Sequence, residues 1–175
     1  NFAHGSLYML GAYCGYTALQ TLTGPLGFWA AALAAALAVG AFGLLVECLI
    51  LRRLYRAPEL FQLVATFGVV LVAQDLTLML WGPEDLLGPR APGLDGAVML
   101  LGQPVPEYDL ALIAVAPLVL LGLWLLMSKT RAGILIRAAT QDREMVGALG
   151  INQSLLFSGV FFLGAALAGL GGALQ

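Results

Sequence analysis

The chain opens with polar side chains placed directly before a long apolar segment. Asn1, His4 and Ser6 fall in the run NFAHGS, and the residues up to position 22 are mostly apolar. Polar groups and broken backbone persist inside a bilayer only where protein buries them or water reaches them. Ser6 is also a candidate N-cap, so the free N–H groups of a helix starting there would point at whatever occupies the break. The polar side chains therefore line the route of a solute, satisfy a neighbouring helix, or lie at the membrane surface.

Further polar side chains lie inside apolar stretches, where ionisable groups are costly and indicate a function. They are Glu47, Thr66, Gln74 and Asp75. Glu47 is about one turn from Arg52, which favours a structural ion pair. Gln74 and Asp75 lie about two turns before the end of their stretch, so they either border the mouth of a pathway or bond across helices.

The residue types argue against an enzyme. The single histidine and the isolated Asp75 supply neither a Ser/His pair nor a pair of aspartates. The motif GxxxxGK[ST] is absent from the sequence, so any ATP would be hydrolysed by another subunit. Cys14 and Cys48 occur without CxxC or a Cys/His cluster, so we expect no metal site and no cofactor. We also expect no nucleic-acid partner, because basic and aromatic residues are not interleaved.

The composition is that of a membrane protein. Hydrophobic residues make up 61% of the chain and charged residues 10%, against about a quarter charged in soluble domains. Membrane lipid is therefore the expected solvent. The chain begins at Asn1 rather than Met and ends at Gln175 within an apolar run, so we expect it to be an internal part of a longer protein.

Apolar stretches predict an all-α polytopic bundle of about five membrane helices, because a span needs about 20 residues. The expected spans are 6–22, 28–51, 60–81, 110–127 and 154–175. Seven of the eight basic residues lie in the connections 52–59 and 128–152, which the positive-inside rule places in the cytoplasm. The acidic, Pro- and Gly-rich connection 82–109 is then extracytoplasmic, and 1–175 forms one transmembrane domain.

Two local patterns refine this picture. In the 82–109 connection, residues 98–101 predict a strand, Gly102-Gln103 a type II′ turn, and Pro104 and Pro106 an edge strand. Small residues recur at four-residue spacing, which permits close helix packing within a bundle or across a dimer interface. These pairs are Gly11/Gly15, Ala165/Gly169 and Ala168/Gly172.

The connection 128–152 contains a short helix with both ends marked. Asp142 is a favourable N-cap and Gly150 suits the left-handed position after the last turn. Met145 and Leu149 stand four residues apart and form an apolar face. That face either docks a soluble partner or packs on the chain's own helix ends.

Three segments together resemble the branched-chain amino acid permease family of bacterial ABC importers. They are NFAHG, RRLYRAP and RAATQDREMVGALGIN, which occur in the expected order across the chain. The resemblance implies an inner-membrane subunit with further helices before Asn1 and after Gln175. It implies three protein partners: ATP-binding-cassette ATPase subunits, a second permease subunit, and an extracytoplasmic substrate-binding protein.

In that family the segment corresponding to Arg137–Asn152 couples the permease to the ATPase. The resemblance assigns roles in chain order: Asp142 starts the helix, Met145 and Leu149 face the ATPase, and Gly150, Ile151 and Asn152 end it. Val146 departs from the alanine typical of the family, and it either alters the docking face or points away from it. The substrate implied is leucine, isoleucine or valine, with Asn1, His4, Ser6, Gln74 and Asp75 on its route. Urea and short-chain amides are alternatives, as is an ATP-independent secondary transporter.

Overall fold

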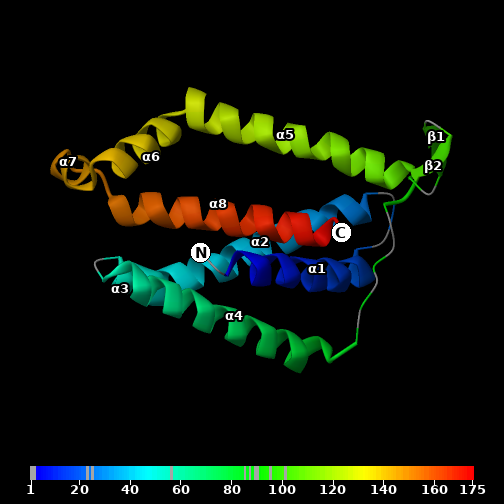
Figure 1. Ribbon diagram of the computed structural model, residues 1–175, viewed down its shortest axis with the longest axis horizontal. Helices are drawn as coiled ribbons and strands as arrows, with labels where there is room; N and C mark the ends of the chain where they lie inside the picture. Colours follow the sequence, from blue (N-terminus) through cyan, green and yellow to red (C-terminus); the bar gives the residue numbers. More distant parts are fainter. Residues whose placement is uncertain are drawn as a thin grey trace. The chain divides into compact units, whose positions relative to one another are not determined.

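The computed structural model describes residues 3–22, 24, 26–55, 57–84, 86, 88, 91–94, 96–100 and 102–175. The chain divides into two compact units, which are described separately here. The first unit comprises Asn1–Pro89 with Ser158–Gln175, and the second comprises Arg90–Phe157. Figure 1 shows the helices of both units, coloured along the chain.

The first unit is built from helices. In chain order they are α1 (His4–Thr21), α2 (Gly27–Val46), the π-helical segment η1 (Glu47–Leu51), α3 (Arg52–Leu54), α4 (Glu59–Trp81) and the part of α8 (Gln153–Ala173) from Ser158 onward. The segments α2, η1 and α3 follow one another without a break, so together they form a single span, Gly27–Leu54. The expected boundaries 28–51 and 60–81 are therefore close to those observed.

Small residues bring α1, α2 and α8 into backbone contact. A Cβ added to Gly11 would lie 2.2 Å from the carbonyl oxygen of Gly169, and one added to Gly172 would lie 1.8 Å from that of Tyr8. A Cβ on Gly169 would lie 2.6 Å from the Cβ of Val39 on α2. Of the two roles predicted for the small residues, tight packing within the chain is the one that these contacts display.

The far end of α4 is also joined to α1. The indole of Trp81 donates a 2.7 Å hydrogen bond to the hydroxyl of Thr17, and its ring lies 5.4 Å from that of Tyr13. Leu10 of α1 and Ala73 of α4 belong to one buried cluster. Leu10 lies near Ala73 and the later Thr17 contacts the later Trp81, so α1 and α4 run parallel.

The second unit starts with a β-hairpin, β1 (Ala97–Leu100) and β2 (Gln103–Pro106), paired antiparallel with Leu100 opposite Gln103. The predicted hairpin is confirmed, but Gln103 pairs with Leu100 and so belongs to the return strand rather than to the turn. Gly102, with φ of 82°, stands directly before that strand. The predicted type II′ turn at Gly102-Gln103 is therefore wrong.

The remaining elements of the second unit are α5 (Glu107–Lys129), α6 (Arg131–Gln141), α7 (Arg143–Ala148) and the first residues of α8. The helix α6 was not predicted. Thr130 caps it, because its hydroxyl accepts a 3.1 Å hydrogen bond from the N–H of Gly133 and donates to the carbonyl of Leu126 at 2.6 Å. A Cβ on Gly133 would lie 2.2 Å from the carbonyl oxygen of Met127, so only glycine fits this corner.

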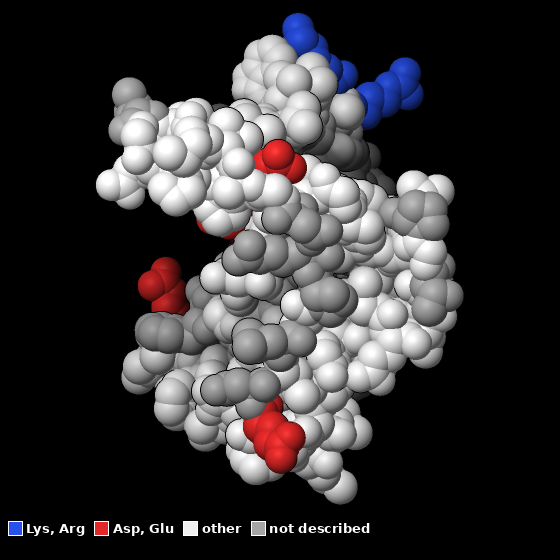
Figure 2. Space-filling model, turned by 90° about the vertical axis from the view of Figure 1, so that its right-hand side faces the viewer, with Lys and Arg blue, Asp and Glu red and all other residues white. Residues whose placement is uncertain are grey.

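Four helical segments of the described chain are long and apolar enough to cross a membrane. They are Gly27–Leu54, Glu59–Trp81, Glu107–Lys129 and Gln153–Ala173. The helix α1 forms as expected but is not among them, because its 18 residues include His4, Ser6, Thr17 and Gln20. The all-α bundle is confirmed, and the expected count of about five is corrected to four. On the face in Figure 2, acidic side chains are scattered over a largely uncharged surface, and basic side chains lie at its upper edge.

Candidate functional site

The helix α7 begins as predicted. The carboxylate of Asp142 accepts a 2.9 Å hydrogen bond from the N–H of Met145, which satisfies one of the free donors of the first turn. Glu144 lies in the same turn, where the helix dipole favours a negative charge. A helix of six residues is too short to be stable alone, so these end contacts are needed to hold it.

The helix also ends as predicted. Gly150 has φ of 77° and donates to the carbonyl of Gly147 at 3.0 Å. The N–H of Ile151 folds back to the carbonyl of Val146 at 3.4 Å. This pair of hydrogen bonds is the Schellman arrangement, which needs a residue that tolerates the left-handed conformation.

Two apolar side chains in α7 and at its end are exposed on the surface of the second unit. Met145 is 58% exposed and Leu149 is 71% exposed, whereas Val146 is 3% exposed. Val146 therefore points inward, and its bulk is not on the exposed face. Within their own unit, Met145 and Leu149 are uncovered.

The helix α7 is tied to the start of α8. The amide of Gln153 donates to the carbonyl of Arg143 at 2.5 Å, and the guanidinium of Arg143 lies 4.2 Å from the ring centre of Phe157. Asn152 accepts a 3.1 Å hydrogen bond from the N–H of Leu155. Asn152 is therefore the N-cap that begins α8 rather than the end of α7, a role that sequence reasoning missed.

Arg137 contributes to the corner between α5 and α6. Its guanidinium donates to the carbonyl of Met127, in the last turn of α5. Such a contact satisfies a carbonyl that has no partner within its own helix. The side chain thus holds α6, which precedes α7, against the end of α5.

The first unit contains a buried polar cluster around Glu47, which is 0% exposed. Arg52 approaches both oxygens of the Glu47 carboxylate, with Nη2 to Oε2 at 3.1 Å and Nε to Oε1 at 3.4 Å. Tyr55 donates to Oε1 at 3.0 Å, and Ser158 donates to Oε2 at 2.6 Å. The predicted Glu47–Arg52 pair is confirmed. Ser158 was missed, because it lies 111 residues away in the chain and carries no local signal.

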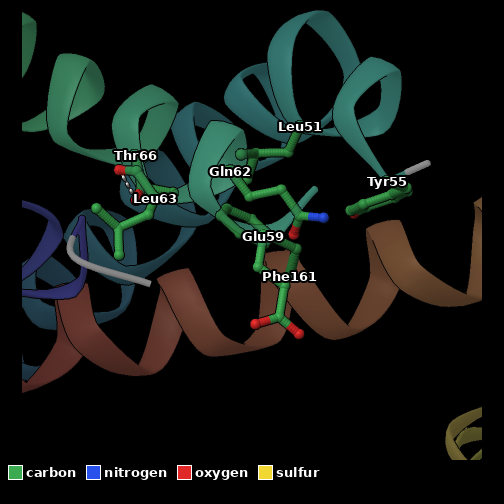
Figure 3. A pocket seen from close by; sticks show the side chains of 7 residues that line it. All are labelled: Leu51, Tyr55, Glu59, Gln62, Leu63, Thr66 and Phe161. Atoms are coloured by element: carbon green, nitrogen blue, oxygen red, sulfur yellow. Dashed lines mark hydrogen bonds between the residues drawn. The ribbon is translucent and has the colours of Figure 1, made fainter. Parts of the chain in front are cut away.

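A pocket of about 340 Å³ adjoins this cluster (Figure 3). It is lined by Leu51, Tyr55, Glu59, Gln62, Leu63, Thr66 and Phe161. The side chain of Tyr55 is shared, since its ring lines the pocket and its hydroxyl binds Glu47. Gln62 donates to the carbonyls of Leu54 and Ala57, which closes the connection before α4. The pocket has the volume of a small-molecule site.

The polar residues at the start of the chain are only partly described. Asn1 lies outside the described residues. The helix α1 begins at His4 rather than Ser6, because Ala3 already has nearly helical dihedral angles, with φ of −67° and ψ of −6°. Ser6 is therefore not the N-cap, and its buried hydroxyl donates instead to the carbonyl of Ala3 at 2.8 Å. His4 is exposed in the first turn.

The start of α1 packs against residues of α2, η1 and α4. Ala3 belongs to a buried cluster with Val46, Leu51 and Val69. Val69 stands close to the centre of α4, Glu59–Trp81. Leu51 of the same cluster lies near the end of the span Gly27–Leu54, so the depth of His4 in the membrane stays a prediction.

Gln74 and Asp75 are exposed on α4. The residues that α4 buries at this level are Ala73 and Thr77, and Ala73 packs with Leu10 of α1. Asp75 is two residues from each of them, so it lies on the opposite side of the helix. The structure therefore does not bring Asp75 to the helix that carries His4.

The whole chain, residues 1–175, matches the family described as the permease component of the branched-chain amino acid transport system. It is 30% identical over 96% of its length to the high-affinity branched-chain amino acid transport system permease protein BraD of Pseudomonas aeruginosa, covering 58% of that protein. It is 26% identical over 99% of its length to the corresponding protein LivH of Escherichia coli K12, covering 59% of it.

The chain thus spans somewhat more than half of the curated relatives that it matches. No solved structure matches it. The matched range, residues 1–175, includes the polar start of α1, the Glu47 cluster and the capped helix α7. The chain belongs to the family of permease components of the branched-chain amino acid transport system.

Proposed function

We propose that this chain is part of the membrane subunit of a bacterial ATP-driven importer for branched-chain amino acids. The subunit lies in the inner membrane, pairs with a second permease subunit, and receives its solute from an extracytoplasmic binding protein. ATP is hydrolysed by separate ATPase subunits, in keeping with the absence of a GxxxxGK[ST] motif from the sequence.

The observation that carries this proposal is the exposed face of α7. Met145 and Leu149 present apolar surface on a short helix that is capped at both ends and braced through Arg137 and Gln153. An exposed apolar face on a rigid protrusion is suited to insertion into a groove of a partner. Basic residues of the same connection, Arg131 and Arg143, favour the cytoplasmic side, where the ATPase acts.

A solute route is proposed along the first unit. His4 is exposed in the first turn of α1, and the pocket of the first unit carries Glu59, Gln62 and Thr66 among apolar neighbours. An amino acid with an aliphatic side chain needs this combination of a few polar groups and an apolar wall. Asn1 and Gln74 remain candidates for the same route, and Ser6 supports it through the backbone of Ala3. Asp75 lies on the other side of α4 and would belong to a separate part of the path.

The docking face is tested by binding of the ATPase to the full-length protein in detergent. We expect the double variant Met145→Gln, Leu149→Gln to weaken this binding about 100-fold, because two apolar side chains lose their burial. The matched control is Met99→Gln, Leu100→Gln, which alters another exposed Met-Leu pair, on the hairpin. We expect the control to bind as the parent protein does. Equal binding by both double variants would contradict the proposal.

The substrate class is tested in proteoliposomes that contain the complete importer. We expect ATP-dependent uptake of leucine, isoleucine and valine in the presence of the binding protein. Uptake of urea or short amides alone would assign the substrate differently. Uptake that needs an ion gradient and no ATP would identify a secondary transporter and contradict the proposal.

A further inference from the structure

Ser158 lies where the chain passes from the second unit to the first. The boundary between the units falls between Phe157 and Ser158, inside the uninterrupted helix α8. Before the boundary, Gln153 and Phe157 contact Arg143 of α7. Directly after it, Ser158 joins the cluster around Glu47. A single helix therefore carries the contacts to α7 and to the buried carboxylate within about two turns.

The hydroxyl of Ser158 bridges the two charges of the cluster. It accepts a 2.6 Å hydrogen bond from Nη2 of Arg52 and donates a 2.6 Å hydrogen bond to Oε2 of Glu47. A hydroxyl can both donate and accept, which neither a charged nor an apolar side chain of this size can do. Ser158 is itself buried, so water does not replace it readily.

The cluster lies on an unusual part of the span Gly27–Leu54. Glu47 is the first residue of the π-helical segment Glu47–Leu51, which connects α2 to α3. Such segments are rare and are frequently found at functional sites. Tyr55 extends the cluster to the pocket, because its hydroxyl binds Glu47 and its ring forms part of the pocket wall.

We propose that Ser158 is a positioning residue that fixes the start of α8 to the Glu47–Arg52 pair and so passes movement of α7 to the span Gly27–Leu54. The inference rests on the proposed function in one respect, because it takes α7 as the helix that receives the ATPase. Movement of α7 displaces the first turns of α8 through Gln153 and Arg143. Ser158 delivers that displacement to the ion pair and, through Tyr55, to the pocket wall.

The test uses the complete importer in proteoliposomes, with the variants Ser158→Ala and Ser158→Thr. The control is Thr77→Val, which removes a buried hydroxyl that donates to its own helix at Ala73. Two quantities are measured for each: ATPase bound per permease, and leucine taken up per ATP hydrolysed. We expect Ser158→Ala to bind the ATPase normally and to lose about tenfold in leucine per ATP, the effect of one hydrogen bond to a charged group.

We expect Ser158→Thr, which keeps the hydroxyl, to recover most of the coupling, and Thr77→Val to stay near the parent ratio. An unchanged ratio in Ser158→Ala overturns the inference, as does loss of bound ATPase in that variant. The Met145→Gln, Leu149→Gln variant separates this inference from the proposed function. If that variant loses the ATPase while Ser158→Ala keeps a normal ratio, only the role of Ser158 is refuted. If that variant keeps the ATPase, the proposed function itself is refuted.

Discussion

At the scale of single residues, some glycines cannot be replaced by a larger residue, because two helix backbones are in contact there. Gly172 of α8 is buried against the backbone of α1, where it faces the carbonyl of Tyr8. Close approach of this kind replaces the hydrophobic drive that lipid cannot supply between membrane helices. The fold of the first unit therefore depends on positions that carry no side chain.

Replacing Gly172 by alanine should destabilise the protein strongly, because the new Cβ would lie 1.8 Å from the carbonyl oxygen of Tyr8. The melting temperature in detergent measures this loss. Gly164→Ala on the same helix is the control, since an added Cβ there meets nothing within 4 Å. Similar melting temperatures for the two variants would show that α1 and α8 are not packed in this way.

His4 is the titratable side chain closest to the start of α1. If it lines the solute route, His4→Ala should lower uptake of leucine at least about tenfold through loss of a specific polar contact, while the amount of bound ATPase stays normal. Uptake by the complete importer in proteoliposomes measures the effect. Near-normal transport would reject the route through His4.

At the scale of elements, α7 depends on its two ends because six residues cannot form a stable helix alone. Gly150→Ala should cost about 1 kcal/mol locally, since alanine is strained at φ of 77°. Faster amide exchange in α7 would report the loss. Gly159→Ala in α8 is the control, because its Cβ meets nothing within 4 Å and its φ is not positive. Unaltered exchange in α7 for Gly150→Ala would contradict the assigned end of the helix.

The elements differ in how well the sequence predicts them, and the range of the determining contacts explains the difference. Asp142 and Gly150 act on neighbours within a few residues, so both ends of α7 could be identified from sequence. The predicted turn of the hairpin wrongly included Gln103, because glycine also suits the position directly before the return strand, where Gly102 lies. The helix α6 was not predicted, because Arg131 and Arg137 resemble the basic residues of a cytoplasmic connection.

Residues whose partners are far away in the chain could not be predicted from the sequence. The pair of Glu47 and Arg52 was predicted because five residues separate them. Ser158 joins the same pair from 111 residues away, and only the packing of α8 brings it there. The start of α1 was placed two residues late because Ser6 resembles an N-cap, whereas its hydroxyl is used within the helix.

At the scale of the whole molecule, the two units have different proposed tasks. The first unit packs α1, α2, α4 and part of α8 around Glu47 and the pocket, and it supplies the proposed solute route. The second unit carries the hairpin, α5, α6 and α7, and it supplies the proposed contact with the ATPase. The helix α8 belongs to both, which is why movement at α7 has a covalent path to the buried ion pair.

The central claim is that α7 docks on a nucleotide-hydrolysing partner in the cytoplasm. Photocrosslinking from position 145 in native membrane vesicles, with position 99 of the hairpin as the control, tests it most directly. The account predicts a crosslink from position 145 to the ATPase subunit and none to it from position 99. Absence of that product at position 145, or modification of position 145 by a membrane-impermeant reagent added outside the cell, would contradict the account.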